Sequence, residues 1–170
     1  MDAIKNTTVN DGADIPIREA FEWYSQVEGP GMSYWYKDIE RWWKESNLKD
    51  HDGISLEEQQ LDPRSLWNTY KDLIALRKSQ PALATGEQRF AKNNNKNLLT
   101  FIRSDKNDRF LVAINLSSEY VNTTLSKHKI TGRNGNTPTI AYFTEQAQIK
   151  QRDKTFLLQL EPFGFGVWKL

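Results

Sequence analysis

The sequence contains no cysteine, which excludes disulfide bonds, thiolate nucleophiles and cysteine-ligated zinc from any account of this protein. It also has no apolar run that approaches the roughly 18 residues of a membrane span. The N-terminus lacks a positive stretch followed by an apolar one, so no secretory signal is expected there. These absences leave the compartment open and predict no membrane partner.

The chain also lacks an excess of charge of either sign. The chain has 23 Lys and Arg against 22 Asp and Glu, so the whole molecule has no field that would gather nucleic acid or an anionic membrane. We therefore expect a neutral partner and no nucleic acid. There are only two His, and no glycine-rich phosphate loop or Asp-rich calcium loop occurs, so the sequence predicts neither a metal nor a cofactor.

Aromatic residues are abundant, with six Trp, six Tyr and eight Phe in 170 residues. They supply enough apolar area for the core of one ordinary domain, or of a small domain with an appendage. Residues 1–14 are polar and are interpreted as a loop. In the segment that follows, Trp35, Ile39, Trp42 and Trp43 recur at the spacing of one helical face, which predicts a short amphipathic helix.

The same aromatic cluster allows two interpretations. Trp35, Tyr36, Trp42 and Trp43 could stack on the apolar faces of sugar rings and form a glucan platform. Packing in a core is the favoured alternative, because helical spacing usually marks a buried face.

A longer helix is predicted over residues 63–79. Asp62 is a good N-cap, and Pro63 fits the first helical position, where its missing amide hydrogen costs nothing. The apolar residues of this helix recur at helical spacing at Leu66, Trp67, Tyr70, Leu73 and Ile74. Pro81 and Gly86 end the helical pattern.

After Gly86 the pattern changes to short β-rich runs separated by turn residues. Seven strands are expected, at 88–92, 97–103, 109–115, 120–125, 139–143, 155–160 and 163–169. Strands so closely spaced, with no helical run between them, predict an antiparallel sandwich or open barrel. Phe163, Phe165 and Val167 alternate with Gly164 and Gly166, and these glycines are expected to mark close backbone approach or a bulge.

Three sequence segments resemble the α-amylase family of glycoside hydrolases, family 13. They are IREAFEWY at 17–24, HDGISLEEQQLDPRSLWNTYKDLIALRKSQPAL at 51–83, and LEPFGFGVWKL at 160–170. The resemblance implies an α+β chain: a helical remnant of a (β/α)8 barrel over residues 1–84, including the last barrel helix, followed by an antiparallel β-sandwich domain over 85–170. A complete barrel needs about 250 residues, so the resemblance implies a C-terminal fragment of a longer enzyme.

That longer enzyme, called the parent below, is expected to hydrolyse α-glucosidic bonds in starch-like oligosaccharides with retention of configuration. The reaction needs a nucleophilic carboxylate and a carboxylic acid about 5 Å from it, and no family motif for either is found. The nearest imitation is His51 with Asp52, but the polar run before them predicts a loop instead of a buried strand. Glu57 and Glu58 are adjacent, so their side chains diverge on a helix or a strand. We predict no catalytic residue in this chain.

The resemblance also implies a place for the segment around Arg18 and Trp23, near the rim of the substrate cleft of the parent. The family commonly has Pro where Ala20 stands. Starch or an α-glucan oligosaccharide is then the expected partner, reached through the parent. His128 is interpreted as an exposed strand or loop residue.

Other classes of protein remain open at this point. The chain could be a free-standing carbohydrate-binding module, or an unrelated β-sandwich interaction protein. For an unrelated interaction protein, the helix at 63–79 is expected to be an independent partner-binding element. For a fragment, its apolar face predicts a homo-oligomer, or else a rearranged monomer in which this segment folds back onto the β-domain, because four large side chains on it need cover. The β-domain itself is expected to be a structural accessory domain.

Overall fold

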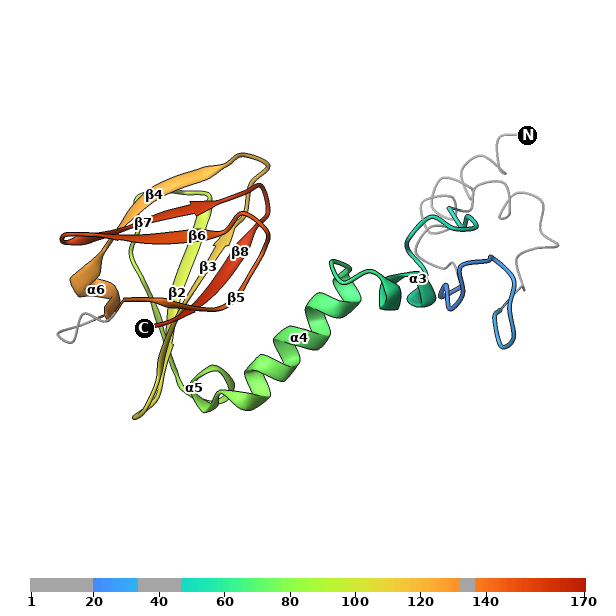
Figure 1. The fold of residues 1–170 in the computed structure, drawn as a ribbon, viewed down its shortest axis with the longest axis horizontal. Coiled ribbons are helices and arrows are strands. Elements are labelled where there is room, and N and C mark those ends of the chain that lie inside the picture. The colour runs from blue at the N-terminus through green and yellow to red at the C-terminus, as the bar shows by residue number, and fades with distance from the viewer. Residues whose placement is uncertain (1–19, 34–46, 132–136) are drawn as a thin grey trace, which may run out of the picture. The chain divides into compact units, whose positions relative to one another are not determined.

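The computed structural model describes residues 20–33, 47–131 and 137–170 of the chain. The chain divides into two compact units, residues 1–71 and 72–170, which are drawn in Figure 1. The predicted amphipathic helix around Trp35 and Trp42 lies outside the described residues, so that prediction stays a prediction.

Helix α3, Leu56–Leu61, begins with a reciprocal cap. The Glu58 amide donates to the hydroxyl of Ser55 at 3.3 Å, and that hydroxyl donates to Glu58 Oε2 at 2.7 Å. The Ser55 hydroxyl thus satisfies one of the amides that the first helical turn leaves open. The Ser-x-x-Glu spacing is the sequence signal for this helix, which was not among the helices expected from the sequence.

Helix α4, Leu66–Ser79, starts three residues later than the helix expected over 63–79. Asp62 caps a turn instead of the helix, because its carboxylate accepts the amide of Arg64 at 2.9 Å and its carbonyl accepts the amide of Ser65 at 3.0 Å. The Ser65 hydroxyl then accepts the amide of Asn68 at 3.2 Å. Ser65 is therefore the residue that caps α4.

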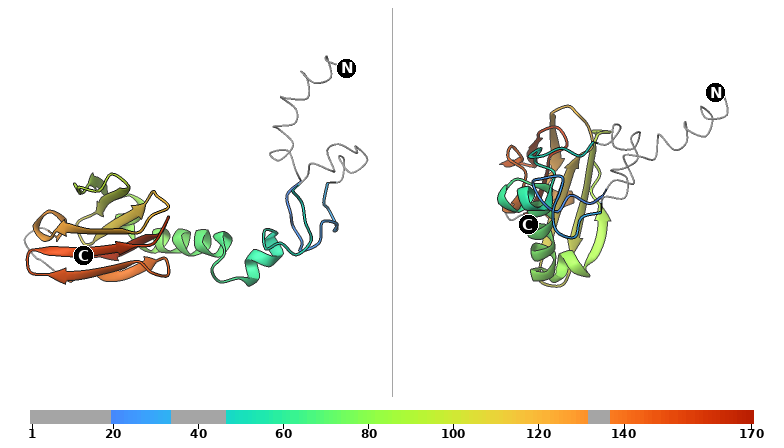
Figure 2. Two further views of the ribbon diagram at one scale, coloured as in Figure 1. Left: turned by 90° about the horizontal axis from the view of Figure 1, so that it is seen from above. Right: turned by 90° about the vertical axis from the view of Figure 1, so that its right-hand side faces the viewer.

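In the described part of the second unit there are short helices and eight strands. The helices are α5, Pro81–Ala84, and α6, Lys127–Thr131. The strands are β1 Glu87–Phe90, β2 Leu98–Ser104, β3 Arg109–Asn115, β4 Val121–Ser126, β5 Thr139–Phe143, β6 Gln148–Arg152, β7 Thr155–Leu160 and β8 Phe165–Lys169. They form two antiparallel sheets, ordered β1-β2-β3-β8-β5 and β4-β7-β6, which Figure 2 shows from two further directions.

The main core lies between the two sheets. It takes Leu111 and Trp168 from the five-stranded sheet and Leu125, Phe156 and Leu158 from the three-stranded one, all almost fully buried. Burial of a large apolar side chain is worth about 1.5–3 kcal/mol, so this layer accounts for the stability of the unit. The predicted antiparallel β-domain is confirmed.

A second apolar layer covers the outer face of the five-stranded sheet. Ala82 of α5 is completely buried and clusters there with Phe110, Val112 and Val167, and Leu76 from the end of α4 packs against them. The five-stranded sheet is thus covered on both faces, which explains why β3 is apolar almost throughout instead of alternating.

All seven expected strands are present, each within two residues of the expected bounds. Strand β6 was missed because its sequence, QIKQR, is polar and four of its five residues are exposed at a sheet edge. Helix α6 was missed too, and His128 lies in this helix instead of a strand or loop. Five residues of high charge, bounded by strands, give no helical period to detect.

Candidate functional site

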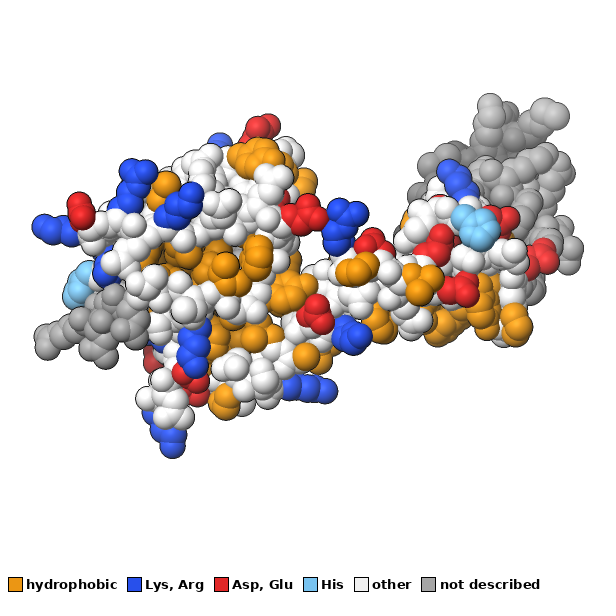
Figure 3. Space-filling model, viewed as in Figure 1, with side chains coloured by type: hydrophobic (Ala, Val, Ile, Leu, Met, Phe, Trp, Pro, Cys, Tyr) orange, Lys and Arg blue, Asp and Glu red, His pale blue; other side chains and the backbone are white. Residues whose placement is uncertain are grey.

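An apolar groove lies in the N-terminal unit. Its volume is about 540 Å³. One wall is helix α4 at its start, with Leu66, Trp67 and Tyr70, and the opposite wall is the segment at 20–22 with Ile54. The groove therefore joins segments more than thirty residues apart in sequence. Figure 3 shows hydrophobic side chains gathered on the surface of this unit.

Backbone hydrogen bonds hold the loop wall together by joining residues 22–25 to residues 51–56. The amide of Leu56 donates to the carbonyl of Glu22 at 2.8 Å, and the amide of His51 donates to the carbonyl of Ser25 at 2.7 Å. Gln59 ties α3 to α4, because its Oε1 accepts the amide of Trp67 at 3.0 Å. The shape of the groove thus depends on loop backbone as much as on apolar contact.

Among the described aromatic residues of this unit, Phe21, Trp23 and Tyr70 are exposed, and the rings of Phe21 and Trp23 do not form a flat platform. Trp23 is 48% exposed, and its ring centroid lies 4.5 Å from that of Phe21 with the planes tilted by 53°. The Nζ of Lys71 lies 5.1 Å from the centroid of the Trp67 ring and covers one of its faces. A sugar ring could stack on Trp23 alone, whereas a groove with Leu66 and Tyr70 more than 60% exposed is better suited to apolar side chains.

Among the sequence-predicted binding residues, only Trp23 can be placed. It lines a second, smaller groove of about 490 Å³ together with Tyr24 and Pro30. The remaining predicted residues lie outside the described part of the chain: Arg18, Trp35, Tyr36, Trp42 and Trp43. The groove residues Phe21 and Ile54 were missed, because a contact between distant loops leaves no periodic signal.

Three described carboxylates of this unit accept backbone amides. Glu57 Oε2 accepts the amide of Ser25 at 2.8 Å, and Asp50 Oδ1 accepts the amide of Val27 at 2.7 Å. Asp52 Oδ1 accepts the amide of Ile54 at 3.0 Å, in a loop where Gly53 has a φ of +85°. The interpretation of His51 and Asp52 as loop residues is confirmed.

Hydrogen bonds also lower the pKa values of Glu57 and Glu58. The Ser25 amide, and then its hydroxyl, lower the pKa of Glu57, and the Ser55 hydroxyl lowers the pKa of Glu58, from an ordinary value of 4.5. A glycosidase general acid needs a raised pKa so that it stays protonated at neutral pH. The pKa shifts of both glutamates run in the opposite direction from that of a general acid.

The described residues contain neither a cluster of metal ligands nor a membrane-spanning helix. No group of three or more His, Asp and Glu residues able to hold a metal ion occurs among residues 20–33, 47–131 and 137–170. No helix within the same ranges is long and apolar enough to cross a membrane.

Comparison with known proteins links this geometry to one family. A family model described as maltogenic amylase, C-terminal domain, matches residues 88–167. Alpha-amylase 3 of Dictyoglomus thermophilum is 30% identical over 104 residues, which are 61% of this chain and 19% of that protein. A protein of Rhizobium meliloti named probable alpha-glucosidase is 39% identical over 61 residues, 36% of this chain and 11% of that protein. The chain therefore spans a fifth or less of the length of these relatives.

Solved structures give the same answer at the level of fold. The alpha-amylase from H. orenii superposes with a TM-score of 0.66 at 21% identity, over 90% of this chain and 28% of that one. An isomaltulose synthase mutant from Erwinia rhapontici NX5, solved with its natural substrate sucrose, gives 0.60 at 23% identity, over 88% and 24%.

Proposed function

The chain belongs to the α-amylase family of glycoside hydrolases and has, over residues 88–167, a C-terminal domain of that family, and from this premise we propose that it serves a parent enzyme that hydrolyses α-glucosidic bonds with retention. Its own role is structural: the β-domain stabilises the catalytic barrel and contributes no residue to catalysis. Membership of the family replaces the expectation of an unrelated β-sandwich protein.

The observation that supports this role most directly is the state of the carboxylates. Retaining hydrolysis needs one carboxylic acid and one carboxylate about 5 Å apart. Glu57 and Glu58 belong to one helical turn and both have lowered pKa values, because serine side chains and amides hold them ionised. The direction of these two shifts supports a structural role for Glu57 and Glu58.

We also propose that residues 1–84 are the end of a barrel, and the exposed apolar face of helix α4 supports this. Helix α4 has no fully buried residue, and Leu66, Tyr70 and Ile74 are 66%, 62% and 49% exposed. Large exposed apolar patches mark interaction sites on soluble proteins. Barrel strands and the neighbouring barrel helix of the parent would cover this face.

A free-standing carbohydrate-binding module is the second candidate, and the exposed ring of Trp23 is the observation that favours it. Stacking on an aromatic ring is worth about 1 kcal/mol or somewhat more. A millimolar dissociation constant corresponds to about 4 kcal/mol, so one such ring alone binds a glucan more weakly than that. A structural role predicts no measurable affinity at all.

Affinity electrophoresis in gels with soluble starch distinguishes the two roles. We expect the intact chain and a Trp23→Ala variant to migrate equally with and without starch. A Lys71→Ala variant, which frees the covered face of Trp67, provides a comparison in which a new stacking face is exposed. Retardation of the intact chain that is lost in Trp23→Ala would replace the structural role with carbohydrate binding.

A further inference from the structure

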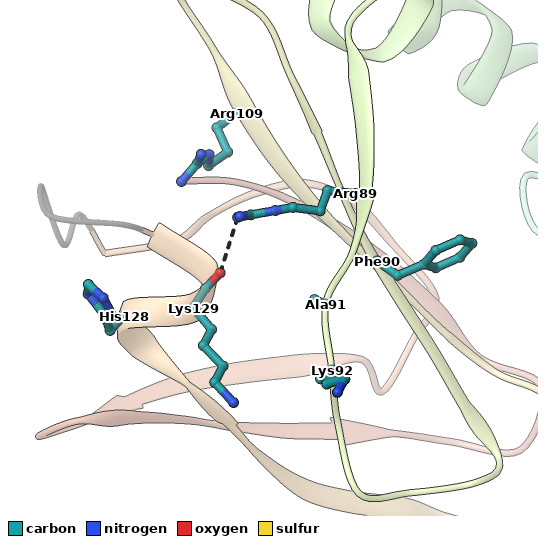
Figure 4. A pocket seen from close by; sticks show the side chains of 7 residues that line it. All are labelled: Arg89, Phe90, Ala91, Lys92, Arg109, His128 and Lys129. Carbon is teal, nitrogen blue, oxygen red and sulfur yellow. Dashed lines mark hydrogen bonds between the residues drawn. The ribbon is translucent and has the colours of Figure 1, made fainter.

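A basic cavity in the β-unit is separate from the apolar groove. Its volume is about 450 Å³, and it lies between strand β1 with the two residues after it, the start of β3, and helix α6. The lining comprises Arg89, Lys92, Arg109, His128 and Lys129, with Phe90 and Ala91. In Figure 4 the ring of Phe90 points away from the basic side chains. None of the seven lining residues is acidic.

Two of the four cationic side chains in the lining, Arg89 and Arg109, make structural hydrogen bonds that use only some of their N–H donors. Arg89 Nη2 donates to the carbonyl of Lys129 at 3.5 Å, drawn as a dashed line in Figure 4, and Arg109 Nη1 donates to the carbonyl of Ile130 at 3.3 Å. These bonds serve carbonyls in the last turn of α6 and orient both guanidinium groups. A guanidinium has five N–H donors, so most of them remain available.

The other two cations have no such role in the part of the chain that is described. The exposed ammonium groups of Lys92 and Lys129 make no hydrogen bond or ion pair with any described residue. Asp108, the acid next to Arg109 in sequence, is engaged elsewhere, with Lys169 Nζ at 2.6 Å. The positive charge of the cavity is therefore not neutralised by its lining or by this neighbour.

The charge of the whole unit adds to this local excess. Residues 72–170 contain 15 Lys and Arg but only 8 Asp and Glu, a net charge of +7, whereas residues 1–71 contain 8 and 14, a net charge of −6. The near-neutral total of the chain, on which the expectation of a neutral partner rested, is the sum of two units of opposite sign. A concave site on a basic surface concentrates anions.

We propose that this cavity binds the phosphate group of a phosphorylated sugar or of a phosphorylated glucan. A phosphate monoester has close to two negative charges and three acceptor oxygens, and guanidinium groups bind such oxygens in pairs. The cavity is within the range of small-ligand sites, about 300–1,000 Å³, and can hold one sugar ring with its phosphate. The choice of a sugar rests on the proposed function, whereas recognition of phosphate does not.

Calorimetric titration of the full chain at low ionic strength tests the site, with glucose 6-phosphate, inorganic phosphate and glucose as separate ligands. We expect both phosphates to bind, glucose 6-phosphate more tightly, and glucose not at all. Loss of one charge-assisted hydrogen bond weakens binding about tenfold or more, so Lys129→Gln and Arg89→Gln should each have that effect. Lys150→Gln removes the same charge from an exposed position on β6 outside the lining and should change affinity less than about twofold.

The possible failures are distinguishable. Equal affinity for inorganic phosphate and glucose 6-phosphate, with both lost in Lys129→Gln, would remove the sugar and leave the anion site. No binding at millimolar phosphate, or equal weakening by Lys129→Gln and Lys150→Gln, would overturn the site itself. Because Lys129 is exposed and its ammonium group bonds to no described residue, its variant should melt with the intact chain, which thermal unfolding checks. Phosphorylated starch, compared with unmodified starch in the same gels, then decides between a soluble sugar phosphate and a glucan.

Discussion

A methyl group added at Gly166 should destabilise the β-unit more than any other single-carbon change in β8. An ideal Cβ at this position would lie 2.2 Å from Cη2 and 2.5 Å from Cζ2 of Trp168. Ordinary carbon contacts are about 3.5 Å or longer, so the indole must move by about 1.3 Å. Trp168 is completely buried between the two sheets, and its ring has no free space to enter. The φ angle of Gly166 is not positive, so the cost is steric and not conformational.

Overpacking of this kind costs about 1–3 kcal/mol. In a domain of about 100 residues each kcal/mol shifts the melting temperature by about 4–8 °C, so a cost of 2 kcal/mol predicts a fall of about 8–16 °C. Thermal unfolding followed by far-ultraviolet circular dichroism measures it. The Trp168→Phe background removes the ring atoms that the methyl group meets, so Gly166→Ala should cost at least about 1 kcal/mol less there. Two results would refute the steric argument. One is an equal cost of Gly166→Ala in both backgrounds, and the other is a melting temperature of Gly166→Ala within about 2 °C of that of the unsubstituted chain.

Three further predictions concern other parts of the molecule. Asn115→Ala should cost about 2–4 kcal/mol, because the buried Nδ2 donates to the carbonyls of Glu119 at 2.6 Å and Glu161 at 2.7 Å and both would be left open; the exposed Asn122→Ala should stay within about 0.5 kcal/mol in urea denaturation. The amides of Asp108 and then Asn107 lower the pKa of Asp105 in the folded state. The carboxylate therefore contributes stability above its unfolded pKa of about 3.9, and this contribution is lost as the pH falls from there through the lower folded pKa. Asp105→Asn should flatten the acid limb of the curve of stability against pH, and an unchanged limb would contradict this. Sedimentation equilibrium should detect a homo-oligomer that Ile74→Lys weakens about 10- to 100-fold and Lys78→Gln does not, whereas a monomer at every concentration would show that the exposed face of α4 is solvated.

The β-unit could be predicted closely because its signals are local. Strands such as β3 and β7 have β-branched and aromatic residues between clear turns, and their expected bounds agree with the structure. Gly164 and Gly166 were expected to mark close backbone approach or a bulge, whereas the structure places the side chains of Glu161 and Trp168 against them. Strand β6 has no apolar face to reveal it, since its role is to complete an edge.

The candidate sites could be predicted far less well, because both depend on contacts between distant segments. The apolar groove brings Ile54 beside Leu66, and the basic cavity brings Arg89 beside Lys129, forty residues later. Neither pair has a motif or a periodic spacing. The charge of the cavity was concealed for a related reason, since a total of +1 over the chain carries no information about its distribution.

Hydrolysis of maltoheptaose by the purified chain tests the central claim most directly, because the claim is that this family member has structural carboxylates and no catalytic pair. Reducing ends released over a long incubation should not exceed those of a buffer control, at any pH between about 4 and 8. Activity that follows the chain through purification and disappears in Glu57→Gln, Glu58→Gln or Asp52→Asn would contradict the account and would place the reaction in this chain.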